Sequence, residues 1–253
     1  MTTALVEATR DEHVLVVVMQ RQEKRNAVNR ELALAIDDAL NLLDDDPDLW
    51  VGVLSGTQRV FSAGSDMSPE AGDNRTDRGG EYGIIRRARR KPLIAAIEGF
   101  ALGGGMEMAL ACDLVVAARD AVFGLPEVRR GVLPTSAGLF RAPRSLPLNL
   151  ARELILIGDP IDAARAHGAG FVNVLAEPGG ALEAAIALAK RVCLNAPLSV
   201  QACLAAVNQR LADDDDAGWV ATAKALDAIR DTADFVEGRQ AFFERRSPRW
   251  TGQ

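Results

Sequence analysis

The chain has 253 residues and a mass of 27.0 kDa, with 48% hydrophobic and 25% charged residues. This composition is ordinary for a globular protein, and the length suits one large domain or one domain with a small appendage. The formal net charge of −6 argues against nucleic acid as a general partner.

The three cysteines, Cys112, Cys193 and Cys203, are odd in number and scattered along the chain. They predict free thiols in a reducing compartment rather than a disulfide framework, and none has the spacing of a zinc site. Residues 1–10 lack the basic start and apolar run of a secretory signal, and no apolar run reaches the ~18 residues of a membrane span. We therefore expect a cytoplasmic protein that is not bound to a membrane.

Strands and helices alternate along the first three quarters of the chain. Short β-branched and aliphatic runs predict buried strands at 14–19, 50–55, 93–98, 114–117 and 171–175. Apolar residues at helical spacing predict helices at 29–43, 105–111, 148–156 and 181–194, and after Pro197 at 198–211, 217–230 and 233–246. This pattern predicts an α/β core over residues 1–196 and a helical region over 197–253.

Residues 67–83 form a long polar segment without apolar periodicity, which predicts a mobile lid or a disordered loop. Tyr82, the only tyrosine, lies in it and is expected either to close over a ligand or to lie at the surface. The basic run that follows suggests an exposed helix face or a landing site for a phosphorylated ligand; its members are Arg86, Arg87, Arg89, Arg90 and Lys91. The acidic runs 44–46 and 213–216 are expected at helix ends and exposed turns.

Two glutamates stand in segments punctuated by glycine and proline. Glu107 ends the sequence Ala-Leu-Gly-Gly-Gly-Met-Glu, and Glu127 ends Phe-Gly-Leu-Pro-Glu. Two carboxylates at one site can share acid–base work, one accepting a proton while the other donates one. Glycines can expose backbone N–H groups where a negative oxygen develops. Together these features indicate addition or removal of water, or proton movement, next to a carbonyl group.

Six segments occur in a fixed order between residues 13 and 250. They are RNAVN at 25–29, FSAGSD at 61–66, IEGFALGGGME at 97–107, FGLPE at 123–127, LIGDPIDA at 156–163 and EGRQAFFERR at 237–246. In this order and spacing they resemble the crotonase superfamily, and within it the enoyl-CoA hydratases.

The resemblance implies a crotonase-like spiral of ββα units over residues 1–196, followed by a helical trimerisation region over 197–253. It also implies a homotrimer, or a hexamer built from two trimers, and an acyl-CoA thioester as substrate. No metal ion and no cofactor is expected, since CoA is part of the substrate.

The resemblance also assigns roles to individual residues. Glu127 is expected to protonate the α-carbon and Glu107 to activate water, while the backbone N–H groups of Ser65 and Gly104 hold the enolate oxygen. The residues expected to contact CoA are Arg25, Ala27, Ala63, Asp66, Phe242 and Arg245. The predicted reaction is the reversible syn addition of water to a 2-enoyl-CoA thioester, as in fatty acid β-oxidation.

One segment departs from the common hydratase pattern. After Leu133 and Pro134 the family often has Gly-Ala-Gly-Gly, whereas this chain has Thr135-Ser136-Ala137-Gly138. The added hydroxyls suit a polar acyl group or cap a helix, and the Leu-Pro-Glu segment also resembles carnitinyl-CoA dehydratases. The alternatives are therefore a carnitinyl-CoA dehydratase, an enoyl-CoA isomerase, or an acyl-CoA-binding protein without activity.

Two other enzyme classes fit the sequence poorly. A serine hydrolase needs a base, usually histidine, and both histidines, His13 and His167, lie outside the six segments. A dinucleotide-dependent oxidoreductase would show a Gly-x-Gly-x-x-Gly motif after its first strand, and the glycines at 103–105 lack that spacing.

Overall fold

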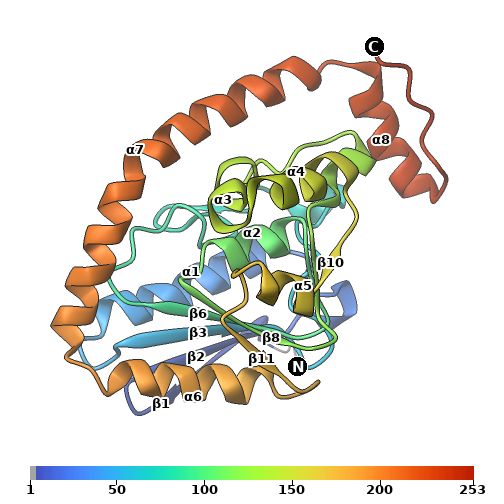
Figure 1. The fold of residues 1–253 in the computed structure, drawn as a ribbon. Coiled ribbons are helices and arrows are strands. Elements are labelled where there is room, and N and C mark those ends of the chain that lie inside the picture. Colours follow the sequence, from blue (N-terminus) through green and yellow to red (C-terminus); the bar gives the residue numbers. More distant parts are fainter. Residues whose placement is uncertain (1–3) are drawn as a thin grey trace.

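A six-stranded sheet forms the centre of the protein, seen in a computed structural model that describes residues 4–253 (Figure 1). Its strands, in spatial order, are β1 (Val6–Asp11), β2 (Val14–Met19), β3 (Val51–Ser55), β6 (Leu93–Ile97), β8 (Leu114–Ala118) and β11 (Val174–Ala176). The edge strand β1 is antiparallel to β2, and all other neighbours are parallel. The mixed α/β architecture predicted from the sequence is confirmed.

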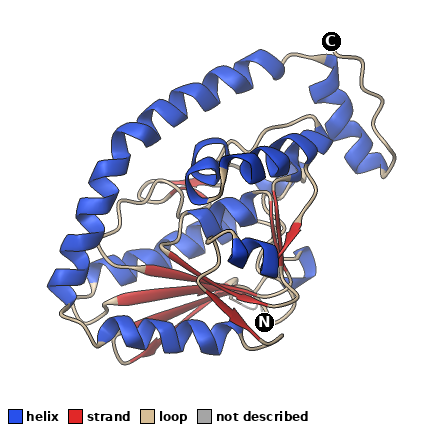
Figure 2. Ribbon diagram, in the orientation of Figure 1, coloured by secondary structure: helices blue, strands red, loops and turns tan. Residues whose placement is uncertain are grey.

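The parallel strands consist of aliphatic runs that are almost fully buried. All five residues of β3 and of β6 are buried, and continuous apolar runs of this kind are typical of strands covered on both faces. Two of the covering helices are α1 (Arg30–Asp45) and α6 (Ala181–Cys193), drawn blue beside the red strands in Figure 2. α1 starts where predicted because the side chain of Asn29 accepts a hydrogen bond from the N–H of Leu32. α6 lies close to the sheet because it buries three alanines at four-residue spacing.

A second, three-stranded sheet carries the Gly-rich segments. It consists of β7 (Phe100–Leu102), β9 (Val122–Gly124) and β10 (Ile161–Asp162), with β9 in the middle. Around it lie α2 (Gly104–Leu110), the 3₁₀ helix η3 (Pro126–Arg130), α3 (Gly138–Ser145), α4 (Leu148–Ile157) and α5 (Ala163–Gly168).

The pairing of β7 with β9 places the two glutamate segments next to each other. The two strands are parallel, with Leu102 opposite Gly124, and the N–H of Gly103 donates to the carbonyl of Gly124 at 2.8 Å. β7 leads directly into α2 and β9 into η3, so both elements begin at the same edge of the sheet. The register of one strand pair therefore brings Glu107 and Glu127 toward one site.

The segment 67–83 is folded, so the predicted disorder is wrong. It contains the 3₁₀ helix η2 (Pro69–Ala71) and a two-stranded hairpin of β4 (Arg75–Thr76) and β5 (Gly80–Glu81). The hydroxyl of Thr76 donates to Asp37 of α1 at 2.9 Å. Thr76 and Arg78 thus fasten the hairpin to α1, Arg78 through Asp45.

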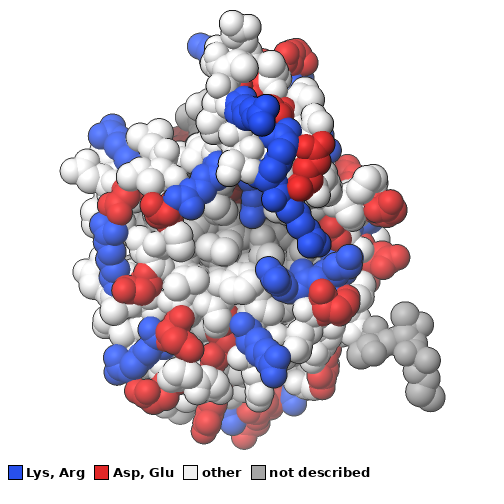
Figure 3. Space-filling model, turned by 90° about the vertical axis from the view of Figure 1, so that its right-hand side faces the viewer, with Lys and Arg blue, Asp and Glu red and all other residues white. Residues whose placement is uncertain are grey.

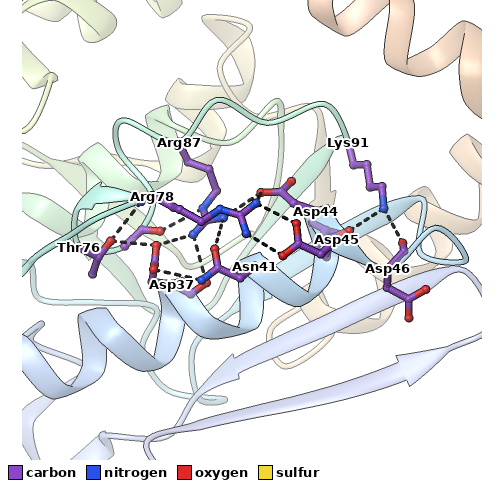
Figure 4. Close-up of polar contacts among 12 residues, drawn as sticks. Asp37, Asn41, Asp44, Asp45, Asp46, Thr76, Arg78, Arg87 and Lys91 are labelled. Atoms are coloured by element: carbon purple, nitrogen blue, oxygen red, sulfur yellow. Dashed lines mark hydrogen bonds and ion pairs between the residues drawn. The ribbon is translucent and has the colours of Figure 1, made fainter.

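The basic run after the hairpin is largely buried, which contradicts both sequence-based interpretations for Arg87, Arg89 and Lys91. Arg87 is bound by Asp37 and Asp44 of α1 (Figure 4). Arg89 donates to Asp113 and to a backbone carbonyl, and Lys91 donates to two backbone carbonyls at the end of α1. Burial lowers the pKa of Lys91. These cations fasten the 76–91 segment to the body of the protein.

The C-terminal region contains two helices rather than the three predicted. α7 (Pro197–Ile229) is continuous over 33 residues and arches along one side of the molecule to α8 (Ala233–Glu244) (Figure 1). The acidic run 213–216 lies inside α7, not in a turn, because Asp215 pairs with Arg141 and Arg144 of α3. Most of α7 is exposed, and its role in trimer formation stays a prediction. Within residues 4–253, no helix is long and apolar enough to cross a membrane.

Candidate active site

Glu107 lies in the first turn of α2, with only 2% of the residue exposed. One carboxylate oxygen, Oε1, accepts hydrogen bonds from the backbone N–H groups of Ser136 (2.7 Å) and Gly138 (3.0 Å). A buried carboxylate needs such partners, and here the segment before α3 supplies them. The polar segment 135–138 noted in the sequence thus positions a candidate catalytic group through its backbone.

Glu127 lies directly after Pro126 in the first turn of η3. Its Oε1 atom is 3.0 Å from the place that a Cβ on Gly103 would occupy, so the carboxylate faces the turn before α2. Its Oε2 atom is buried and has no hydrogen-bond partner among the described residues. A buried carboxylate oxygen without a partner is costly, and it indicates a place where water or a ligand binds.

Burial raises the pKa of both carboxyl groups. For Glu107 the negative charge of Glu127 raises the pKa further, against the two backbone N–H donors that lower it. For Glu127 burial outweighs the favourable charge of Arg130. Because the two groups titrate as a coupled pair, the pair holds a proton more tightly than exposed carboxyls do. One group can then donate a proton while the other accepts one.

The two backbone segments predicted to hold an oxyanion meet beside these carboxyls. Gly64 has φ +92°, and a Cβ there would lie 2.7 Å from the amide nitrogen of Gly104. Gly104 is the first residue of α2, where N–H groups have no partner within the helix. Ser65, the residue after Gly64, is fixed by a parallel bridge to Val28. The structure therefore brings Ser65 and Gly104 together, while their function as oxyanion donors stays a prediction.

Tyr82 also lies at this site, although the sequence left its place open between lid and surface. It is only 3% exposed, and its hydroxyl is 2.7 Å from the Ser65 hydroxyl and 3.5 Å from Oε2 of Glu107. Burial, together with the negative charge of Glu107, raises the pKa of Tyr82, so the phenol remains protonated. Nothing in the sequence around Tyr82, which directly follows the hairpin, predicted its contacts with Ser65 and Glu107.

Four of the residues expected to contact CoA form one group. The N–H of Ala63 donates to the carbonyl of Arg25 at 3.0 Å. Arg21 joins the other two, since its guanidinium donates to the carbonyl of Ala27 and to the carboxylate of Asp66, both at 2.7 Å. Sequence reasoning missed Arg21, which lies just before the first segment of the resemblance.

The two C-terminal residues of the predicted CoA set lie elsewhere, on α8. Phe242 packs under the guanidinium of Arg130, 4.7 Å from the ring centre, and lines a cavity of about 270 Å³ against η3. Arg245 ends α8 and is exposed. Among the described residues, no hydrogen bond, ion pair or cation–π contact joins either one to Arg25 or Asp66. Figure 3 shows Lys and Arg side chains around an uncharged hollow on the face that carries α8.

Comparison with known proteins identifies the family. The model of the enoyl-CoA hydratase/isomerase family matches residues 9–253. The chain belongs to this family, within the crotonase superfamily. It is 34% identical to the 2,3-dehydroadipyl-CoA hydratase of Escherichia coli K12, over 97% of this chain and 98% of that one.

Solved structures of family members share the fold along the whole chain. A carnitinyl-CoA hydratase from Mycobacterium avium has a TM-score of 0.91 and 36% identity, with all of both chains covered. An enoyl-CoA hydratase from Mycobacterium tuberculosis H37Rv has a TM-score of 0.80 and 43% identity, covering 99% of this chain and 100% of that one. The crotonase-like fold implied by the six sequence segments is therefore confirmed.

Proposed function

We propose that this protein is an enoyl-CoA hydratase, a hydro-lyase that adds water reversibly to the double bond of a 2-enoyl-CoA thioester. The observation that carries the proposal is the pair formed by buried Glu107 and half-buried Glu127, whose carboxylate faces the turn before α2 and whose Oε2 atom is buried without a partner among the described residues. Two carboxyls with raised pKa values and one free oxygen suit a bound water molecule that must lose a proton as it attacks. The hydratase names of its relatives support the same reaction.

In the proposed reaction, the thioester oxygen binds between the N–H groups of Ser65 and Gly104. These donors stabilise the negative charge that develops on the oxygen when the β-carbon is attacked. Water, held by Glu107 and Glu127, adds its oxygen to the β-carbon, and a proton from the carboxyl pair goes to the α-carbon. A water proton replaces it on the pair, so the reaction consumes one water molecule and uses no redox step or metal ion.

The CoA portion is proposed to bind along Arg25, Ala27, Ala63 and Asp66. Phe242 and Arg245 are proposed to reach CoA from a neighbouring subunit of a homotrimer or hexamer, a proposal supported by the contact of Phe242 with Arg130 of η3 rather than with that group. A guanidinium is well suited to a phosphate, since it offers two parallel hydrogen bonds.

A second candidate is the dehydration or hydration of a polar acyl-CoA, as the name of the Mycobacterium avium relative describes. The favouring observation is a cluster of hydroxyls in which Tyr82 contacts Glu107, and Ser65 and Ser136 contact Tyr82. Tyr82 and Ser136 are buried, whereas Ser65 is exposed, and a buried hydroxyl rejects a fully apolar chain when binding leaves it unpaired.

The test compares three acyl-CoA substrates and one binding assay. Crotonyl-CoA hydration, followed by loss of the enoyl-thioester absorbance, is expected to show turnover. A crotonobetainyl-CoA assay tests the polar-acyl candidate, and a 3-enoyl-CoA assay tests isomerisation. Tight binding of CoA esters without turnover of any of the three would contradict the proposal and favour a binding protein.

Gly64→Ala is expected to lower kcat/KM about 100-fold, since a Cβ at this position would force the Ser65 and Gly104 amides apart. Gly170→Ala is the matched control, because Gly170 has a similar φ of +85° but no atom within 4 Å of the added Cβ. Both variants carry the same backbone strain, so equal losses of activity would show that strain alone is responsible. Steady-state kinetics and circular dichroism on both variants measure the difference.

A further inference from the structure

Tyr82 lies at the centre of the site without a role in the reaction described above. Its hydroxyl lies 2.7 Å from the Ser65 hydroxyl and 3.5 Å from Oε2 of Glu107, and it also contacts the Ser136 side chain. Its ring lies against the Cα of Gly104, since a Cβ on Gly104 would come within 2.6 Å of the ring carbon that bears the hydroxyl. One side chain therefore contacts a catalytic glutamate and both predicted oxyanion residues.

The backbone at Tyr82 is strained, and the surrounding structure holds it in place. Its φ is +58°, in the left-handed region that aromatic residues rarely adopt. Its N–H donates to the carbonyl of Asn74 at 2.9 Å, and the next residue, Gly83, accepts a hydrogen bond from buried Arg87. Backbone strain of this kind persists only where the surrounding structure holds it, and it is typical of functional sites.

The two oxygens of Glu107 have different partners. Oε1 accepts two backbone N–H groups, which fixes it in place. Oε2 faces only the Tyr82 hydroxyl among the described donors. Oε2 is therefore the oxygen available for proton transfer, and the phenol is the protein group that can orient it and stabilise its charged form.

We propose that Tyr82 is a positioning residue of the active site: its hydroxyl donates to Oε2 of Glu107, and the Ser65 hydroxyl competes with Oε2 as the acceptor. The proposal rests on the hydratase function proposed above, because it assigns Glu107 a proton-transfer role. Tyr82 acts through Glu107: it keeps Oε2 directed toward the site and favours the carboxylate over the carboxylic acid.

The charges around Glu107 set the sign of the expected effect. Glu127 of η3 and Glu81 of the hairpin both raise its pKa, and Arg130 faces Glu127 rather than Glu107. Backbone N–H donors from 136 and 138 lower it. Loss of the Tyr82 donor removes one more group that favours the charged form, so the pKa of Glu107 rises. The acid limb of the activity profile then moves to higher pH.

Tyr82→Phe and Ser65→Ala test the proposal with opposite expected signs. In Tyr82→Phe, the Glu107 carboxyl is expected to titrate about one pH unit higher, and kcat to fall about tenfold. In Ser65→Ala, which keeps the backbone N–H, the phenol loses one of its two competing hydroxyl partners and keeps Ser136, so the Glu107 carboxyl is expected to titrate lower. Thr76→Val is the control, since its hydroxyl binds Asp37 in the same hairpin without contacting Glu107.

The primary measurement is a carbon-13 NMR titration of glutamate carboxyl groups, assigned with Glu107→Gln and Glu127→Gln. Because this titration needs no substrate, it separates the Tyr82 proposal from the hydratase proposal, which fails if no enoyl-CoA is hydrated. Opposite shifts in the two variants, with none in Thr76→Val, support the proposal. An unchanged Glu107 titration in folded Tyr82→Phe overturns it, and if that variant does not fold, an unchanged titration in Ser65→Ala does so.

Discussion

Glu107→Gln and Glu127→Gln are each expected to lower kcat about 10²–10⁴-fold, the range that general acid–base catalysis contributes. Glutamine keeps the shape of the side chain but can neither accept nor donate the carboxyl proton. The double variant is expected to be little slower than the worse single variant, because residues that act as one unit have non-additive effects. Hydration of crotonyl-CoA by the three variants and wild type measures this.

The same two substitutions are expected to stabilise the protein at alkaline pH. Burial raises the pKa of both carboxyls above the ordinary 4.5, so above about pH 4.5 the folded state binds more protons than the unfolded state. The stability of the wild type therefore falls as pH rises through this window. Glutamine has no such proton to lose, so at pH 8 each variant is expected to melt several degrees higher than wild type.

Glu98→Gln is the matched control for a buried glutamate outside the site. Its two oxygens accept the N–H groups of Gly179 and Ala181, before and at the start of α6. Loss of the charge there is expected to lower stability and to leave kcat unchanged, the reverse of the result at Glu107. If Glu107→Gln were instead destabilised at pH 8 with kcat retained, a structural role for Glu107 would be shown and the two-carboxylate mechanism rejected.

The core was predictable because its local signals agree with its tertiary contacts. Strands β2, β3 and β6 are short, mostly aliphatic runs, and this composition alone predicts that they are buried. The start of α1 is also a local signal, because Asn29 caps the helix by accepting from the N–H of Leu32. The glutamate segments were recognisable for a similar reason: their glycines and proline mark the turns that lead from β7 and β9 into the site. The functional roles of these residues stay predictions.

The missed features depend on partners distant in sequence. β1 has four exposed residues and reads as a polar segment, yet it pairs along its whole length with β2. The acidic run in α7 predicted a break because its counter-charges, Arg141 and Arg144, lie some 70 residues earlier. The small strands β7, β9 and β10 have two or three residues each, too few to show a period.

The positions of Tyr82 and the basic run could not be predicted from local sequence for the same reason. The predictions for the segment 67–91 assumed that polar residues face solvent. In the structure, Arg78 and Arg87 bind carboxylates of α1, and the segment that they hold places an aromatic side chain between Ser65 and Glu107. Neither contact leaves a trace in local composition, because each joins residues 17 to 50 positions apart.

Arg87→Met is expected to destabilise the protein by about 3–5 kcal/mol, the usual cost of removing one partner from a buried ion pair. The Arg87 side chain is only 1% exposed and donates to Asp37, to Asp44 at 2.8 Å and to Asn41 at 2.9 Å (Figure 4). Methionine fills much of the same volume but leaves buried Asp37 without its cation and leaves Asp44 only with Arg78, 3.7 Å away. Urea unfolding, followed by circular dichroism, measures the loss.

Arg78→Met is the matched control, since Arg78 also binds the end of α1, through Asp45 at 2.7 Å, but its side chain is 46% exposed (Figure 4). Exposed pairs contribute about 0–1 kcal/mol, so its unfolding midpoint is expected to stay close to that of wild type. Adding Asp37→Asn and Asp44→Asn to Arg87→Met removes the carboxylate charges that lost their Arg87 cation, and is expected to recover part of the lost stability.

Equal unfolding midpoints for Arg87→Met and Arg78→Met would show that the buried network does not hold the hairpin. In that case the strained backbone of Tyr82 would need another anchor.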